Sequence, residues 1–147
     1  MQFNPINLFG FIIVVIMLIP NIIYGIKFKG LEIKCTNKAM NVIEQVGRYG
    51  SMALMVLPLF VWEFGFSSVF MMFVYVLGNG ILLFTYLLVW VFYFKKQTMG
   101  RAMILAIAPT CIFFLSGVTL YHWALVVAAI IFGVGHIYVT YRNNVEG

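Results

Sequence analysis

Residues 69–94 read VFMMFVYVLGNGILLFTYLLVWVFYF, and no charged side chain interrupts them. A helix that crosses a bilayer needs about twenty consecutive apolar residues. This stretch exceeds that length, so it is predicted to span a membrane with some tilt. A helix is the expected form, because lipid offers no hydrogen-bond partner to the backbone and a helix pairs its own polar groups.

The composition of the whole chain agrees with a membrane protein. Of its 147 residues, 64% are hydrophobic and only 9% are charged, and the mean hydropathy is +1.06. Soluble domains carry roughly 25% charged residues, and a soluble chain of this length has too little interior to bury so much apolar surface. We therefore predict an all-α fold, a transmembrane helical bundle that forms a single domain over residues 1–147.

Four further apolar stretches lie to either side of residues 69–94. Five spans are predicted in total, at about 6–26, 49–66, 69–94, 102–119 and 121–141. The boundary between the second and third spans rests on a short turn at Gly65, Ser67 and Ser68. The alternative is that the apolar stretch from 49 to 94 contains a re-entrant segment.

The lysine and arginine residues predict the orientation. They fall into three groups, which are Lys27, Lys29, Lys34, Lys38 and Arg48, then Lys95, Lys96 and Arg101, then Arg142. With five spans, all three groups lie on one side of the membrane, and cytoplasmic loops carry such an excess. The chain is thus predicted to be a multi-pass protein of the cytoplasmic membrane, with its N-terminus outside and its C-terminus in the cytoplasm.

The formal net charge of +5 is explained by the same topology. Basic residues beside apolar stretches are expected to anchor against anionic lipid headgroups. The lipid bilayer is therefore the expected partner, and nucleic acid is not. A second copy of the chain or another membrane protein is the further partner that a small bundle would have.

The polar segment between the first two spans has a helical pattern of its own. Thr36 and Asn37 are helix-capping residue types, and Met40, Ile43 and Gly47 follow at helical spacing. One interpretation is a short amphipathic helix over about 37–47 that lies in the cytoplasmic interface. The other is an extra turn of the second span.

Polar groups inside a bilayer are costly, so each one needs an explanation. Ala129, Gly133, His136 and Thr140 share one face of the fifth span. Ala129 and Gly133 form a small-xxx-small pair that lets another helix pack closely, which turns His136 toward the bundle interior. His136 is then either a neutral histidine bonded across a helix interface, or a proton relay, a ligand contact or a metal ligand.

Asn21 and Tyr86 are expected at the same depth as His136, about 7 Å from the midplane on the cytoplasmic side. Isolated polar groups are costly in hydrocarbon, so at least two of these three side chains are predicted to face a small cavity open to the cytoplasm. The alternative for Asn21 is a local hydrogen bond beside the kink at Pro20. Asn79, between two glycines of the third span, is a candidate for the polar layer or for ligand binding, and this combination also suggests a close helix contact or a local kink.

Motifs of known chemistry are missing from the sequence. It has no nucleophile elbow, P-loop or dinucleotide-binding pattern, and no acidic residue is expected deep in a span. No cofactor is expected, and no Cys/His cluster supports a metal site. Ion-coupled pumps normally need buried acids, so the pattern favours neither an enzyme nor a coupled transporter.

Three short motifs link the chain to other proteins: Pro20-Asn21-Ile22-Ile23-Tyr24, Glu44-Gln45-Val46-Gly47-Arg48 and Gly135-His136-Ile137-Tyr138. Through them the chain resembles a group of small, uncharacterised multi-spanning membrane proteins of Gram-positive bacteria. The resemblance covers most of the chain. It implies location and architecture and carries no activity.

Three hypotheses for the function follow. The first is a non-enzymatic accessory or interaction protein of the cytoplasmic membrane, because no catalytic set is present. The alternative is a small oligomeric permease or exporter of a small molecule, favoured by His136, Asn21 and the tyrosines of the third span. A membrane enzyme acting on lipid has the least support.

Overall fold

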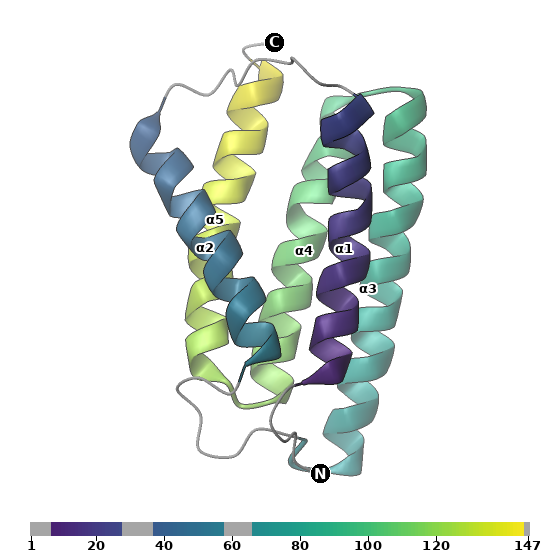
Figure 1. The fold of residues 1–147 in the computed structure, drawn as a ribbon, viewed down its shortest axis with the longest axis vertical. Helices are drawn as coiled ribbons and strands as arrows, with labels where there is room; N and C mark the ends of the chain where they lie inside the picture. Colours follow the sequence, from purple (N-terminus) through teal and green to yellow (C-terminus); the bar gives the residue numbers. More distant parts are fainter. Residues whose placement is uncertain (1–6, 28–36, 58–65, 146–147) are drawn as a thin grey trace.

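The computed structural model describes residues 7–27, 37–57 and 66–145, with side chains as far as Arg142. These residues form five helices and no strand: α1 (Leu8–Lys27), α2 (Lys38–Val56), α3 (Val69–Lys95), α4 (Met99–Thr119) and α5 (Trp123–Val145). Successive helices run in opposite directions between the two ends of the bundle (Figure 1). The all-α prediction is confirmed for this part of the chain.

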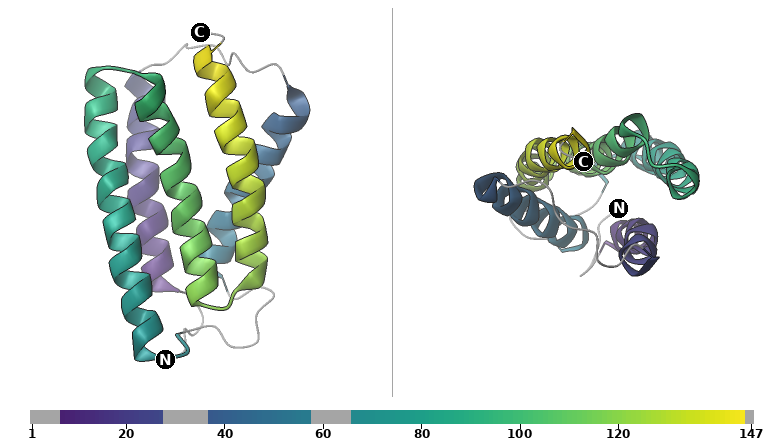
Figure 2. Two further views of the ribbon diagram at one scale, coloured as in Figure 1. Left: turned by 180° about the vertical axis from the view of Figure 1, so that it is seen from behind. Right: turned by 90° about the horizontal axis from the view of Figure 1, so that it is seen from above.

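Four of the helices form a curved row in the order α2, α5, α4, α3, and α1 lies on the concave side of that row (Figure 2). α1 packs beside α3. α2 is inclined, so that it approaches α1 near Met55 and Val56 and stands apart from it at the other end (Figure 1). α1 therefore covers only the part of the row that is near α3.

The two ends of the bundle differ in charge. At the end where α1 finishes, each of the five helices carries a lysine or arginine in its terminal turns: Lys27, Lys38, Lys95, Arg101 and Arg142. We call this the basic end. The helix termini described at the opposite end carry no charged side chain.

Polar side chains mark where the helices begin. Asn37, Ser68 and Thr98 cap α2, α3 and α4, each accepting a hydrogen bond from the backbone N–H three residues later. Asn7 does the same for α1, with Gly10 N donating to its Oδ1 at 3.0 Å. Such caps satisfy backbone donors that a helix leaves unpaired at its start.

Four helices are long and apolar enough to cross a membrane: α1, α3, α4 and residues Trp123–Arg142 of α5. Their positions agree with four of the five predicted spans. Their outward faces remain apolar in the structure, as at Phe70, Phe73 and Phe84 of α3, which are 71%, 54% and 69% exposed. An apolar exterior of this kind suits lipid and not water.

The second predicted span, about 49–66, differs from the structure. The helix there begins at Lys38 and ends at Val56, and residues 58–65 lie outside the described part of the chain. Leu57 is extended, with φ −105° and ψ 144°, because a residue that precedes a proline is kept out of the helical region. Residues 38–47 thus belong to the same continuous helix as residues 49–56, and that helix packs along α5.

The end opposite the basic one is tightly packed. Phe66, Tyr75 and Leu120 form a buried cluster there, and each is at most 5% exposed. Asn7 is fully buried beside them and donates to the Met55 carbonyl at 3.2 Å and to the Tyr75 hydroxyl at 3.3 Å. These contacts join the start of α1 to α2 and α3 at that end of the bundle.

Candidate ligand-binding cavity

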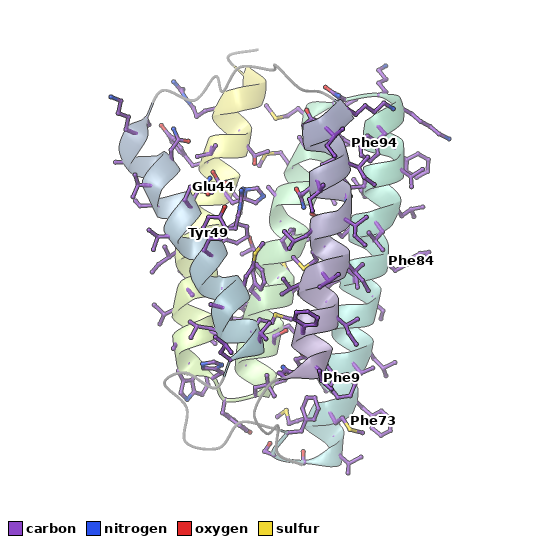
Figure 3. All side chains as sticks on the ribbon, viewed as in Figure 1. Phe9, Glu44, Tyr49, Phe73, Phe84 and Phe94 are labelled. Carbon is purple, nitrogen blue, oxygen red and sulfur yellow. The ribbon has the colours of Figure 1, made fainter. Side chains whose placement is uncertain are left out.

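A charged cluster lies between α2 and α5, inside the bundle. Glu44 is 5% exposed, and Figure 3 shows it on the side of α2 that faces α5. Its Oε1 pairs with Arg48 one turn later on α2 and lies 2.9 Å from Nδ1 of His136 on α5. The carboxylate is therefore compensated from both helices, as a buried charge must be.

Two glycines bring these groups together. A Cβ atom at Gly47 would collide with the backbone of Phe132, and one at Gly135 would lie 2.6 Å from the Glu44 nitrogen. Without side chains at these positions, the backbones of α2 and α5 approach closely. The His136 ring then stacks on Phe132, with centroids 4.7 Å apart, which holds it opposite Glu44.

A second polar contact joins α1 to α3. The Asn21 amide donates to the Tyr86 hydroxyl at 2.7 Å and to the Met17 carbonyl at 2.8 Å. The second of these bonds is the local one that the sequence offered as an alternative, beside the proline at position 20. Asn21 therefore makes both the local contact and a contact across the bundle.

Two cavities meet between these clusters. The larger, about 240 Å³, extends toward the basic end and is lined by Asn21, Tyr24, Tyr86, Trp90, Tyr93, Ala102, Leu105, Ala106, His136 and Thr140. The smaller, about 80 Å³, lies deeper and includes Met17, Arg48, Phe113 and Phe132. Both are lined by Asn21, Tyr86 and His136. The structure thus places all three residues of the predicted polar layer around one space.

Aromatic rings form the wall of the larger cavity on the side of α3. Trp90 makes edge-to-face contacts with Tyr86 and Tyr93, at 6.3 and 5.6 Å between centroids. Tyr24 of α1 packs against Trp90 and Tyr93 at 5.5 and 5.8 Å. Trp90 is 7% exposed, and its indole Nε1 has no hydrogen-bond acceptor among the residues described.

The remaining candidate residues lie elsewhere in the bundle. Asn79 is outside both cavities, buried between α3 and α4, where it donates to Ser116 Oγ at 3.0 Å. Ala129 is fully buried. Gly133 faces α4, because a Cβ there would lie 2.6 Å from Cγ2 of Thr110. Asn79 therefore makes the close helix contact that was its alternative role.

Glu44 and Arg48 were not predicted as site residues. The sequence placed Glu44 either in an interfacial amphipathic helix over about 37–47 or in an extra turn of the second span, and no acidic residue was expected deep in a span. In the structure Glu44 belongs to the continuous helix α2 and is buried. The available signal was the spacing of Glu44, Gly47 and Arg48, an ion pair at i, i+4 enclosing a small residue on one helix face. Its partner His136 lies 92 residues further along the chain, and nothing in the sequence links the two.

In comparisons with protein-family models, curated proteins and solved structures, nothing matches this chain. The resemblance to small membrane proteins of Gram-positive bacteria stays a prediction. Two of its motifs nevertheless meet in space, because Glu44 and Arg48 belong to one and His136 to another. Within the described residues, no group of three potential metal ligands from His, Cys, Asp and Glu occurs.

Proposed function

We propose that α2 also crosses the membrane, so that the chain has five crossings. α1 ends at the basic end and α3 begins at the opposite end (Figure 1). If both span the bilayer, the chain between them must return across it, and α2 runs in that direction. Its 19 residues extend about 28 Å at 1.5 Å per residue, close to the thickness of a hydrocarbon core of about 30 Å.

The basic end is the cytoplasmic end in this proposal, which places the N-terminus outside and the C-terminus inside. The support is the gathering of a basic residue from every helix at one end. Single cysteines at Ser67 and Lys96 test the orientation in a chain whose Cys35 and Cys111 are replaced by serine. An impermeant maleimide should label Ser67→Cys from outside intact cells and Lys96→Cys only after the cells are opened. The reverse pattern would contradict the orientation.

For the molecular function, we propose a small permease or exporter of the cytoplasmic membrane. The observation that carries this proposal is the cavity ringed by Asn21, Tyr86 and His136, which extends toward the basic end. At the opposite end, Asn7 and Tyr75 are hydrogen-bonded to each other. Binding sites for small molecules are concave, mostly apolar and supplied with a few convergent polar groups. A carrier that exposes its site to one side of the membrane at a time needs this arrangement.

The accessory role is the competing hypothesis, and one experiment separates the two. Proteoliposomes containing the protein are incubated with a cytosolic small-molecule extract, and accumulated compounds are measured by mass spectrometry against empty liposomes. A permease should accumulate at least one compound, and His136→Ala should abolish this without lowering the amount of protein inserted. No accumulation of any compound, with a foreign subunit copurifying at constant ratio, would favour the accessory role. A stable homo-oligomer in detergent would agree with the permease.

A further inference from the structure

We infer that the cavity binds a small organic anion with an aromatic or other planar apolar body. This inference deepens the proposed permease by naming the chemical class of its substrate, and it rests on that proposal only for the step of transport. The binding claim itself stands on the groups that line the cavity.

Several hydrogen-bond donors line the two cavities, together with groups that both donate and accept. Arg48 lines the smaller cavity, and its guanidinium is always charged. Tyr86 supplies a hydroxyl, which makes a long hydrogen bond to the Met17 carbonyl at 3.5 Å. Trp90 supplies a buried indole N–H that meets no acceptor in hydrogen-bond geometry among the residues described. A buried donor without a partner costs free energy that an incoming acceptor recovers.

No carboxylate competes for these donors among the residues described around either cavity. Glu44 is the acid that the described residues bring near the cavities, and it is not part of either lining. It accepts hydrogen bonds from Arg48 and His136. Its single negative charge is balanced by Arg48, so the cluster adds no net negative charge beside the cavity. An organic cation would find aromatic rings here but no free negative charge, so the balance favours an anion.

The walls of the cavity indicate the body of the ligand. Tyr24, Trp90 and Tyr93 present ring surfaces within 6 Å of one another, and such rings pack favourably against another planar group. A cavity of about 150 Å³ is enough for benzene, so about 240 Å³ accepts one ring with a short side chain. The basic residues at the cytoplasmic end would raise the local concentration of anions at the entrance.

Three probes of nearly equal shape test the charge preference: benzoate, benzyl alcohol and benzylammonium. Their binding to the full-length protein in detergent is measured by isothermal titration calorimetry. Benzoate should bind at least ten-fold more tightly than benzyl alcohol, and benzylammonium should bind more weakly than both. Benzylammonium that binds as tightly as benzoate would overturn the inference.

A pair of tryptophan variants tests the location. Trp90→Phe keeps the ring and removes the N–H, so it should weaken benzoate binding three- to ten-fold while leaving benzyl alcohol nearly unchanged. Trp123→Phe is the matched control, since Trp123 is 58% exposed at the start of α5, and it should change neither affinity. Equal benzoate affinity in Trp90→Phe and the parent protein would overturn the assignment to this cavity.

Binding and transport separate the inference from the proposed function. Proteoliposomes that bind benzoate but never accumulate it would contradict the permease and leave the anion site standing. Proteoliposomes that accumulate benzylammonium in preference to benzoate would support a permease and overturn the anion site.

Discussion

The contact between Glu44 and His136 determines which nitrogen of the imidazole ring faces the carboxylate. Nδ1 of His136 lies 2.9 Å from a carboxylate oxygen, so Nδ1 carries a proton and donates it. The neutral ring then leaves Nε2 as an acceptor. The contact therefore fixes both the tautomer and the orientation of the ring.

Removing the Glu44 carboxylate should destabilise the bundle. Glu44→Ala leaves Arg48 and His136 facing each other inside the protein without their acceptor, and breaking a buried ion pair costs about 3–5 kcal/mol. Because the Arg48 side chain is 32% exposed, water screens part of this, and we expect a loss of roughly 2 kcal/mol. Unfolding in mixed micelles with increasing SDS measures it.

The control for this prediction is Lys38→Ala, an exposed change at the start of the same helix. It should alter the free energy of unfolding by less than about 0.5 kcal/mol. Glu44→Gln, which keeps one acceptor, should fall between the two. A stability of Glu44→Ala equal to that of Lys38→Ala would mean that the cluster does not hold α2 against α5.

Among the helices, α2 and α5 depend on glycine at their contact. Gly47→Ala would place a methyl group against the Phe132 backbone, and overpacking of this kind costs about 1–3 kcal/mol. The matched control is Gly80→Ala in α3, where a Cβ meets nothing within 4 Å. Since alanine favours a helix over glycine by about 1 kcal/mol, this control should stabilise. If Gly47→Ala and Gly80→Ala lower the free energy of unfolding equally, the close contact of α2 and α5 is contradicted.

The sequence predicts those helices whose apolar length alone suits a lipid bilayer. α1, α3, α4 and α5 follow from apolar length alone, because each must satisfy a bilayer along its own surface. α2 could not be delimited in this way, since Lys38, Glu44 and Arg48 break the apolar pattern and the helix is held by α5. Asn21, Tyr86 and His136 could be predicted to share one layer, because each lies at a known depth along its own span. The role of Glu44 could not be predicted, because it depends on His136, which lies on another helix.

For the whole molecule, the inside and outside of the bundle should differ in access to water. Thr140 lines the larger cavity, while Cys111 of α4 is exposed on the apolar exterior. In a chain with Cys35 replaced by serine, a water-soluble maleimide added at the basic end should modify Thr140→Cys much faster than Cys111. Thiols buried in lipid stay protonated and meet little reagent. Faster modification of Cys111 would argue that water, not lipid, covers the exterior.

The dependence of α2 on α5 has a consequence for biosynthesis. α2 leaves the ribosome early, with Glu44 and Arg48 paired to each other but with the side of Glu44 that later meets His136 still unpartnered. α5 is the last of the five described helices in chain order. Until it arrives, α2 has neither the apolar length to enter lipid unaided nor the histidine that completes its charge pairing. If α2 crosses the membrane as proposed, chains that stop before α5 should hold it less firmly than the full chain does, and proteases that clear unfinished membrane proteins should degrade them faster.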